Sequence, residues 1–556
     1  LPSNVPQLLS YFHDAPLLKG VMAEIVIGKR KVKAIVVSSS SIEEQKGIIK
    51  KSPFQLKKIS KVISEEPKVS EIQFKILLWL SKHYYTPLGL SLKTVLPSFL
   101  LNKKYTVQNI EVVEKQTKPE LIKVSVRNLE VELLSIINET KGQVLIIVPD
   151  RSALNHFQSV LNKFNPIIIH SSQSSREKFK NWQLVQKGAR ITIGTRLALF
   201  FPFKNLDTIV LEDSLNEMYK SDMTPKYNTA DLAERVASLY GAKLIYNTPF
   251  VSVEQYYNIQ TNKYSLRPVE SKSAPHIQII NTVNELRAGN FQLLSRELKD
   301  DILQAISKKK KILLFSPRKG YSGYLLCQNC GTSVKCLNCS VPMRVHKSVE
   351  LVLICHRCSC IQKFPQFCSN CNSYKLKTSG PSGSQKIYDE VREIIAMSDH
   401  KAPILVLDSD IIKNDTEEDE IISEFEKPGP AIIISTHKIF SHRYNLRFPL
   451  VGIINADSMI ASSDYDIEGK FIYHIKKIFD FEPDKIILQT YASDNEIYKN
   501  LDAVDHEKFY RGELESRKLF NYPPFYRLAK LSYRHTDQNK ALLAARTLVE
   551  KLKMAS

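Results

Sequence analysis

The sequence predicts a multidomain α/β protein whose two largest units are lobes built on doubly wound parallel β-sheets. Three observations predict this fold class. Short apolar runs alternate with helix-length segments across residues 120–270, and a second series of the same kind starts at residue 311. All nine cysteines fall between Cys327 and Cys371, so a separate cysteine module interrupts the second series. Two apolar runs around a basic turn near the N-terminus predict a small β-rich first domain.

Length and charge limit the interpretation. The chain has 556 residues, and at roughly 150 residues per domain three or four units are expected. Lys and Arg number 78 against 58 Asp and Glu, which gives a net charge of +20. A polyanionic partner, with nucleic acid the usual one, accounts for this balance. The alternative is a lysine-rich proteome, in which charge follows genome composition rather than a ligand.

The sequence shows no export or membrane signal. No run of about 18 uncharged apolar residues occurs, so neither a transmembrane helix nor a membrane partner is predicted. Residues 1–20 lack the basic and apolar regions of a signal peptide. We therefore expect a cytoplasmic protein.

Eight of the nine cysteines form four C-x-x-C pairs. A tight turn between two thiolates lets both sulfurs reach one metal ion, and two such pairs complete a tetrahedral four-sulfur zinc site. Four pairs therefore predict two zinc ions, with Cys360 left over. Closed sites of this kind have no open position for a substrate, so the two Zn²⁺ ions are expected to be structural. The predicted ligands are Cys327, Cys330, Cys336, Cys339, Cys355, Cys358, Cys368 and Cys371.

A disulfide framework is the alternative for these cysteines, and a redox role for one pair is another. Disulfide frameworks belong to small exported chains, which does not fit a sequence without an export signal. Cys327–Cys371 also contains few core apolar residues, so metal binding must supply much of its folding energy. We favour the zinc module.

Residues 1–100 are predicted to form the first domain. Ala23–Gly28 and Lys33–Ser39 are expected to be the strands of a β-hairpin around the basic turn GKRK. Ser70–Tyr85 has apolar residues at helical spacing, with Ser70 as the expected N-cap. The polar and charged stretch Leu101–Glu120 is expected to be a linker.

The strands of each lobe are predicted from apolar runs that turn or charge signals bound and helix-length segments separate. In the first lobe they are Val144–Asp150, Pro166–Ser172, Arg190–Thr195, Asp207–Asp213 and Lys243–Pro249. In the second lobe they are Lys311–Pro317, Pro403–Asp410, Ala431–His437, Leu450–Asp457 and Lys485–Tyr491.

Several blocks of the sequence resemble one protein family. The run GTRLALFFPF, within His170–Asp213, is similar to the family's G-T-R-S-A-L-F-x-P-F block. Other similar blocks are Leu56–Pro97, Arg318–Gly331 (RKGYSGYLLCQNCG), Phe448–Ser458 (FPLVGIINADS) and Leu519–Phe525 (LFNYPPF). Together they resemble the PriA family of replication-restart DNA helicases (primosomal protein N-prime) over nearly the whole chain.

The resemblance implies RecA-like lobes and a fixed order of units. We expect a domain like the family's 3′-DNA-end-binding domain (1–100), a linker (101–120), a degenerate helicase lobe one (121–275), the start of lobe two (276–324), the zinc-binding module (325–375), the rest of a degenerate lobe two (376–505) and the start of a truncated C-terminal α+β domain (506–556). The family's nested arrangement would pair Cys327/Cys330 with Cys368/Cys371, and Cys336/Cys339 with Cys355/Cys358; spacing alone leaves all three pairings of the knuckles open.

The family's phosphate-binding loop is missing from this sequence. A helicase of this class cradles phosphates with a Gly-rich loop that ends in Gly-Lys-Ser/Thr, because only glycine lets backbone N–H groups approach closely. The loop should lie one helix before Val144, yet no glycine occurs between Gly89 and Gly142. Val124–Asn128 stands in its place.

Three further motor elements are altered. The acidic box D-E-E-H reads EDSL at Glu212–Leu215, and we interpret Glu212 and Asp213 as ending a strand and solvating its loop; a cation site is the alternative. The arginine motif is absent from Phe471–Lys485, where Lys476 and Lys477 lack the bidentate fork of arginine. The block G-T-Q-M-x-A-K-G reads STHKIFSH at Ser435–His442. We therefore expect no catalytic residues, no cofactor-binding residues for a nucleotide, and no role for ATP and Mg²⁺.

Cations at turns and after strands are the candidate DNA contacts. A hairpin tip with three cations suits phosphate contacts that do not read sequence, although lysines that protect a sheet edge give the same pattern. Tyr11 and Phe12 sit where the family has aromatics around a 3′-terminal nucleotide, but we favour buried core aromatics. The candidate contacts are Lys29, Arg30, Lys31, Arg196, Arg318 and Lys319.

Three functions are compared. The first is a PriA-like DNA-binding protein that acts in replication restart and primosome assembly at forked DNA without ATP hydrolysis. The second is an active ATP-dependent 3′–5′ DNA helicase with an atypical nucleotide site, and the third is a protein–protein scaffold built on the zinc module. The implied partners are DNA (forked or single-stranded, with a 3′ end), other primosome and replication proteins, and single-stranded-DNA-binding protein. We favour the first.

Overall fold

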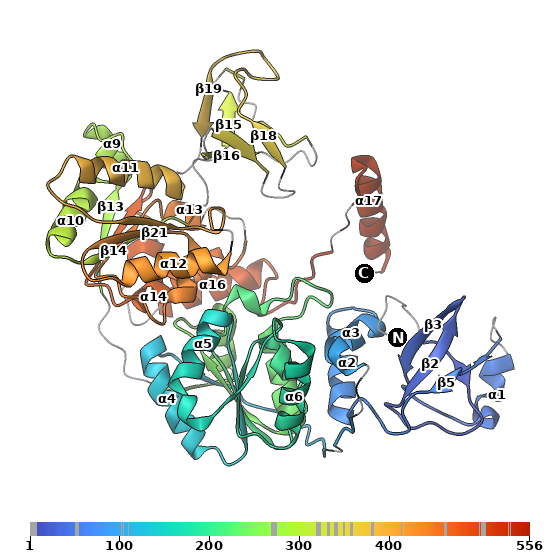
Figure 1. Ribbon diagram of the computed structural model, residues 1–556. Helices are drawn as coiled ribbons and strands as arrows, with labels where there is room; N and C mark the ends of the chain where they lie inside the picture. Colours follow the sequence, from blue (N-terminus) through green and yellow to red (C-terminus); the bar gives the residue numbers. More distant parts are fainter. Residues whose placement is uncertain are drawn as a thin grey trace.

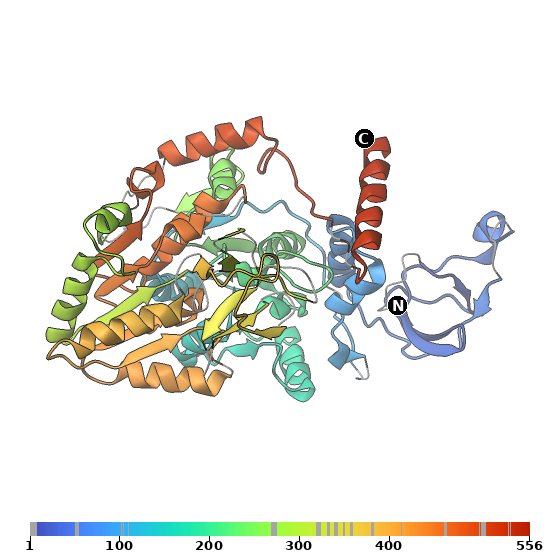
Figure 2. The same ribbon diagram turned by 90° about the horizontal axis from the view of Figure 1, so that it is seen from above.

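The computed structural model describes two stacked lobes, an N-terminal unit to one side and a small β-module that projects from the second lobe (Figure 1). Figure 2 shows that the N-terminal sheet lies at the end of the molecule away from the lobes, beyond helices α2 (Glu71–His83) and α3 (Leu88–Val95). The described residues are 8–555 except 51–54, 102, 104, 109, 268–274, 318–323, 328, 331–333, 338–342, 348–350, 356–359, 380–382, 413, 461–463, 500, 502–506, 532 and 534.

The N-terminal unit is built on the predicted hairpin, with a tighter turn than expected. Ile27 pairs with Arg30, so only Gly28 and Lys29 form the turn, and Arg30 and Lys31 already belong to the second strand. Gly28 has φ +60°, which glycine adopts without steric cost and which a two-residue turn requires here. The elements are β1 (Tyr11–Phe12), β2 (Met22–Ile27), β3 (Arg30–Ile35), α1 (Ile42–Lys50), β4 (Lys57–Lys58) and β5 (Lys61–Val62).

Helix α2 begins at the predicted N-cap. The Ser70 side chain accepts from the Gln73 backbone N–H, and the Gln73 side chain accepts from the Ser70 N–H, so both form a capping box. The buried face of α2 faces lobe one, and the Gln73 side chain also donates to the Phe200 carbonyl. Helices α2 and α3 and the short 3-10 turn η1 (Ser98–Leu100) therefore pack with lobe one rather than with the hairpin alone.

Lobe one is an all-parallel seven-stranded sheet with the order β12-β6-β11-β10-β7-β9-β8. The five strands expected from apolar runs are present, and the central ones are buried along almost their whole length. Strands β6 and β12 were not predicted because they are short and partly polar. The elements are β6 (Glu120–Ile122), α4 (Val126–Glu139), β7 (Gln143–Ile147), α5 (Arg151–Val160), β8 (Ile167–Ile169), α6 (Ser175–Gln186), β9 (Ile191–Gly194), η3 (Arg196–Phe200), β10 (Leu206–Leu211), α7 (Thr229–Tyr240), β11 (Lys243–Asn247), α8 (Val253–Gln260) and β12 (Ser265–Arg267), with the 3-10 turns η2 (Asn162–Phe164) and η4 (Glu217–Tyr219).

The stretch expected as a linker is docked along lobe one. Its described part has no regular secondary structure before β6, but the Val113 N–H donates to the Leu239 carbonyl at 3.1 Å. The carboxylate of Glu114 pairs with Lys75 of α2 and, at 2.9 Å, with Arg235 of α7. This segment therefore fastens the N-terminal helices to the first lobe.

Lobe two is a second all-parallel sheet with the order β13-β23-β22-β14-β21-β20. All five expected strands are present, and β13 is an additional edge strand. The elements are β13 (His276–Asn281), α9 (Thr282–Arg287), α10 (Arg296–Ser307), β14 (Lys311–Phe315), α11 (Ser384–Ala396), β20 (Ile404–Leu407), α12 (Asp415–Glu426), β21 (Ala431–Ser435), η5 (His437–His442), β22 (Leu450–Ile453), α13 (Asp457–Ile460), α14 (Ile467–Phe479) and β23 (Lys485–Thr490).

The cysteine module enters after β14 and returns before α11. It is an antiparallel five-stranded sheet with the order β18-β17-β16-β15-β19. Its strands are β15 (Tyr324–Cys327), β16 (Arg344–Lys347), β17 (Leu351–Ile354), β18 (Ile361–Lys363) and β19 (Leu376–Ser379), and the C-terminal helices of the chain are α15 (Glu496–Lys499), α16 (Glu507–Leu519) and α17 (Gln538–Ala555). Among the described helices, none combines the length and apolarity that a bilayer crossing requires.

Candidate DNA-binding, metal and inter-lobe sites

The interface between the lobes includes the loop between β6 and α4, where the family's phosphate-binding loop would lie. Ser125 caps α4 by accepting from the Asn128 N–H. Val124 and Val126 are 4% and 3% exposed and pack into the core of lobe one. The loop therefore points apolar side chains inward, and its Val126 N–H donates to Asp480 of lobe two at 3.4 Å.

The acidic pair after β10 is buried in the same interface. Glu212 and Asp213 are 1% and 0% exposed. The interpretation that they end a strand and solvate its loop is wrong, because Arg443 of lobe two reaches both carboxylates. Its Nη2 lies 2.5 Å from Glu212 Oε1, and its Nη1 lies 2.7 Å from Asp213 Oδ2. The Arg443 guanidinium thus occupies the position where the alternative interpretation placed a bound cation.

Further groups of lobe two complete these hydrogen bonds. Lys477 Nζ lies 3.0 Å from Asp213 Oδ2, and the Tyr473 hydroxyl donates to Asp213 Oδ1 at 2.6 Å. The Tyr444 hydroxyl donates to Glu212 Oε2 at 2.8 Å. Lys477 lies on the helix where the family's arginines were expected. The sequence analysis did not predict its contact with the acidic pair. Arg443, Tyr444 and Tyr473 were missed, because no motif marks them.

Burial and charge shift the two carboxyl groups in opposite directions. Burial raises the pKa of Glu212 to about 7, against the opposing effect of Arg443. Burial also disfavours ionisation of Asp213, but Arg443 and Lys477 outweigh it and hold the pKa of Asp213 below its usual range. Asp213 is therefore the ionised partner of the two cations.

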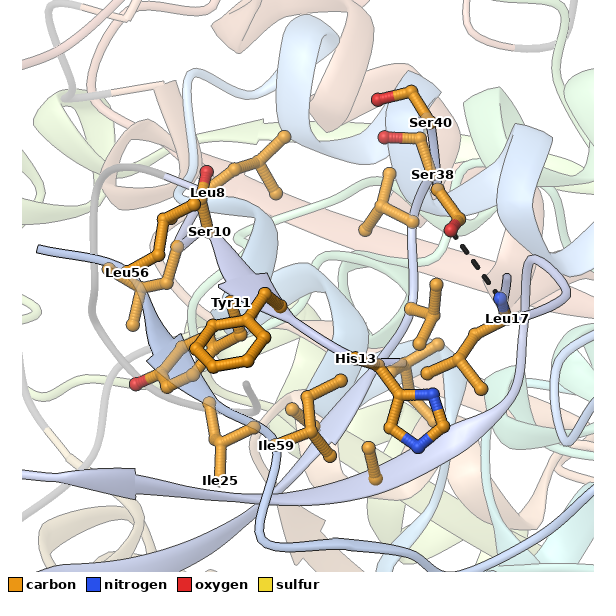
Figure 3. Close-up of a pocket in the computed structure, with 18 of the residues that line it drawn as sticks. Leu8, Ser10, Tyr11, His13, Leu17, Ile25, Ser38, Ser40, Leu56 and Ile59 are labelled. Atoms are coloured by element: carbon orange, nitrogen blue, oxygen red, sulfur yellow. Dashed lines mark hydrogen bonds between the residues drawn. The ribbon is translucent and has the colours of Figure 1, made fainter. Parts of the chain in front are cut away.

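A cavity of about 470 Å³ lies in the N-terminal unit (Figure 3). Tyr11 and His13 lie on either side of Ile59 in this view, and Ser38 and Ser40 form part of the opposite wall. Tyr11 is half-buried, and its hydroxyl donates to the Val26 carbonyl at 2.9 Å. The interpretation of Tyr11 and Phe12 as buried core aromatics is therefore wrong, because both residues line this cavity.

Charged side chains lie on β4, next to the lining residue Ile59 of this cavity, and at the tip of the hairpin. Lys58 of β4 pairs with the exposed Asp14 at 2.5 Å. At the hairpin tip, Lys29 and Arg30 are exposed, and Lys31 pairs with Glu24 at 3.2 Å. Two of the three hairpin cations are thus presented to solvent without an ion pair among the described residues.

The other candidate DNA contacts lie on the lobes. Arg196 begins η3 and donates at 3.4 Å to the carbonyls of Met218 and Lys220, so it is held by lobe one rather than extended from it. Arg318 and Lys319 lie outside the described residues.

Four cysteines meet at one end of the module. Cys327 Sγ lies 3.5 Å from Cys371 Sγ, and Cys330 Sγ lies 3.7 Å from Cys368 Sγ. The ligand atoms of all four lie within 4.8 Å of one another. Sulfurs at about 2.3 Å from a zinc ion would lie about 3.8 Å apart, so this cluster fits a tetrahedral metal site.

The second predicted set is described only in part. Cys336 and Cys355 are 2% and 0% exposed and belong to the small apolar core of the module. Cys339 and Cys358 lie outside the described residues. Cys360, the cysteine without a pair in the sequence pattern, accepts from the Cys355 N–H through its carbonyl at 2.9 Å.

Comparison with known proteins identifies these features. Residues 1–97 match the family model described as "3'DNA-binding domain (3'BD)". The chain is 28% identical over 538 residues to the replication restart protein PriA of Rickettsia felis, covering 89% of this chain and 81% of the relative. It is 26% identical over 428 residues to the replication restart protein PriA of Bacillus subtilis, covering 74% of this chain and 52% of the relative. The aligned part thus spans about half the length of the Bacillus protein.

Among solved structures, the Pyrococcus furiosus Hef helicase domain aligns with 68% of this chain and 93% of its own, at 9% identity and a TM-score of 0.35. S. cerevisiae Dbp5 bound to RNA and ADP BeF3 aligns with 78% of this chain and 89% of its own, at 10% identity and a TM-score of 0.34. Scores of this size carry no argument about function.

Two parallel-sheet lobes that meet at a buried interface, with a cysteine module inserted in the second, define a two-lobed α/β protein with RecA-like sheets. An N-terminal 3′-DNA-binding domain distinguishes it within that class. The chain resembles the replication restart proteins PriA over most of its length.

Proposed function

We propose that this chain is a DNA-binding protein of replication restart that engages a 3′ DNA end and does not hydrolyse ATP. The N-terminal cavity, with Tyr11 on its wall and the exposed Lys58 next in the chain to its lining residue Ile59, supports a grip on a terminal nucleotide by stacking and phosphate contacts. The names of the relatives support a role in restart. With that role we propose other replication proteins as partners and the cytoplasm as the place of action.

The observation that carries the loss of hydrolysis is the guanidinium of Arg443 between Glu212 and Asp213. In helicases and related enzymes, magnesium and the γ-phosphate occupy such a site. Here the acidic pair already has cationic partners, and the loop before α4 offers valines instead of glycines. Both features oppose the second hypothesis, an active helicase.

An ATPase assay tests this proposal. We expect the full chain, with forked DNA and magnesium ATP, to release no more phosphate than its Asp213→Asn variant. Turnover above that of the variant, or ATP-dependent unwinding of the fork, would overturn the proposal. A zinc-loaded preparation with intact fork binding shows that the protein assayed is folded.

A DNA-binding assay tests the 3′-end pocket. We expect tighter binding to a duplex with a 3′ single-stranded tail than to one with a 5′ tail, and we expect Tyr11→Ala to remove this preference. The matched control is Tyr533→Ala, an exposed tyrosine outside the N-terminal unit. Equal binding to both tails by the unaltered chain would contradict the proposed pocket.

A docking role for the cysteine module is a second candidate function. Phe367 and Tyr374 flank the Cys368–Cys371 knuckle, and they are 51% and 78% exposed. Their rings contact edge to face, with centroids 6.2 Å apart. The salt dependence of fork binding separates the two functions, because phosphate contacts weaken steeply with salt, whereas a scaffold with incidental DNA binding shows no such slope.

A further inference from the structure

We propose that Asp480, Arg443 and Lys477 of lobe two together replace a magnesium nucleotide and clamp the two lobes in one closed arrangement. In proteins that bind a triphosphate between two such lobes, phosphate lies at the N-terminus of the first helix and a cation lies on the acidic pair. In this chain, side chains of lobe two supply a negative group at the first position and positive groups at the second.

The negative group is the carboxylate of Asp480, at the C-terminal end of α14. Its Oδ1 accepts from the Val126 N–H, the first residue of α4, at 3.4 Å. The N-terminal end of a helix carries unpaired N–H groups and a partial positive charge, which stabilise an anion. Asp480 is 8% exposed, so it provides this anion from within the protein, across the lobe boundary.

The positive groups are the side chains of Arg443 and Lys477. Arg443 contacts Glu212 and Asp213 through two different nitrogens, and its Nε lies 3.5 Å from Asp480 Oδ2. It therefore links the acidic pair of lobe one to the carboxylate that caps α4. Arg443 is 2% exposed and Lys477 is 4% exposed, so neither charge is shared with bulk water.

The charges in this cluster nearly balance. Three carboxyl groups face two cations, and burial raises the pKa of Glu212 to about 7 and that of Asp480 to about 6, although Arg443 opposes both shifts. Removing one partner from such a cluster leaves an uncompensated buried charge, which is far more costly than neutralising the set. The clamp therefore depends on the whole cluster.

A second contact holds the lobes together on another side. Helix α16 follows the last strand of lobe two, yet it packs on α8 of lobe one. The Tyr510 ring stacks on Tyr256 with centroids 4.2 Å apart, and its hydroxyl donates to the Val251 carbonyl at 2.7 Å. Arg517, 2% exposed, donates to Glu254 at 2.6 Å and lies over the ring of Tyr465 in lobe two.

These two contacts remove the alternation on which a motor depends. Nucleotide-driven motors work because a ligand binds one arrangement of the lobes better than another. In a chain whose own side chains supply the charges of the ligand, the equilibrium between arrangements of the lobes does not shift with the ligand. Its lobes therefore present DNA with one fixed surface, whether or not nucleotide is present.

Small-angle scattering and amide exchange of the full chain test the clamp. We expect the radius of gyration of the unaltered protein to stay the same when magnesium and a non-hydrolysable ATP analogue are added. We expect Arg443→Met to enlarge the radius and to speed exchange in the segment around Val126 on the order of a hundredfold. A nucleotide-dependent change in the unaltered chain would overturn the clamp, as would an Arg443→Met protein with unchanged radius and exchange.

Two further variants guard against general unfolding. Asp480→Asn removes only the anion at α4, and we expect faster exchange in that segment with the zinc content unchanged. In the triple variant Glu212→Gln/Asp213→Asn/Arg443→Met, the cluster loses its acids with its arginine, and we expect the lobes to close again. A triple variant as open as Arg443→Met alone would refute the charge argument.

The matched control is Arg447→Met. Arg447 lies four residues along the same segment, is largely exposed, and pairs with Glu482 at 3.3 Å. We expect no change in radius or exchange. These readouts do not involve turnover, so ATP hydrolysis by the unaltered chain would refute the proposed function, whereas the clamp stands or falls on scattering and exchange.

Discussion

Glu120 connects three neighbouring strands of lobe one. Its carboxylate accepts two hydrogen bonds at 2.9 Å from Arg267 on β12 and pairs at 2.8 Å with Lys243 on β11. The hydrogen bonds from Arg267 and the charge of Lys243 outweigh burial and lower the pKa of Glu120 to about 2. This side chain therefore favours its ionised form in the folded protein more than in the unfolded chain.

A pH titration of stability checks this residue. Because the folded pKa is depressed, the contribution of Glu120 is fully present above 4.5, the ordinary pKa of a glutamate, and is lost as the pH falls towards about 2. We expect Glu120→Gln to lower the unfolding temperature at pH 7. At pH 3 we expect the difference in unfolding temperature between the variant and the unaltered chain to be smaller. The matched control, Glu496→Gln at a widely exposed pair, should match the unaltered chain at both pH values. A constant difference across this range would contradict the prediction.

At the same scale, the inter-lobe cluster shows what the sequence could and could not predict. The loss of the glycine loop was visible from residues 89–142 alone. The partner of the acidic pair was not visible, because Arg443 is 230 residues away from Asp213 and belongs to no motif. Buried charges need a partner, so the burial of β10 was the signal that argued against a solvated acidic pair.

At the scale of elements, the cysteine module is a small sheet with its own apolar core. Two knuckles meet at Cys327–Cys330 and Cys368–Cys371, and Cys336 and Cys355 are buried in that core. Hydrogen bonds support the cluster: the Asn370 N–H donates to Cys368 Sγ at 3.4 Å. Such modules take much of their stability from the metal.

Metal analysis of variants checks the module. We expect about two zinc ions per chain, because four C-x-x-C pairs supply two four-sulfur sites. Cys327→Ser should lower the content by one ion, and the matched control Cys360→Ser should leave it unchanged. Atomic emission on protein dialysed without chelator gives the count, and a folded chain without zinc would contradict the prediction.

The basic hairpin gives a second prediction at this scale. Lys29 and Arg30 are exposed at a two-residue turn, so they suit phosphate contacts as well as protection of a sheet edge. If they bind phosphates, Lys29→Ala/Arg30→Ala should lower the slope of log affinity against log salt by about two. The control is Lys508→Ala, a 90% exposed lysine on α16. An unchanged slope would assign the hairpin cations to edge protection.

The sequence predicted strands well where they were apolar and buried. Every central strand of both sheets was expected, because long apolar runs mark strands covered on both faces. The edge strands β12 and β13 and the strand β6 beside β12 were missed, since Glu120–Ile122 and Ser265–Arg267 have only three residues each and His276–Asn281 is half-buried and partly polar. Neighbouring strands, rather than local pattern, define such edges.

At the scale of the molecule, one apolar core runs through both lobes and the N-terminal helices. It includes Phe74 of α2, Leu211 of lobe one and Phe471 of lobe two. The core of the cysteine module, with Leu325 and Leu353, is separate. Continuous cores unfold cooperatively, whereas units without shared apolar contacts unfold independently.

Calorimetry checks this division. We expect a large transition for the lobes with α2 and α3, and a smaller one for the cysteine module. A zinc chelator should move only the smaller transition to lower temperature, because the metal binds the folded module alone. The control is the same scan with chelator and excess zinc. A single transition that chelator shifts as a whole would show that the module and the lobes unfold together.

The way in which the cysteine module joins lobe two has a consequence for the surface of the protein. Its first strand, β15, pairs with its last strand, β19, and Tyr324 lies opposite Ser379. The chain therefore leaves and re-enters the lobe at neighbouring points, so the parallel sheet beneath does not depend on what is carried between them. A change in this module can therefore alter the surface that the protein presents without a rebuilt parallel sheet in the lobe that carries it.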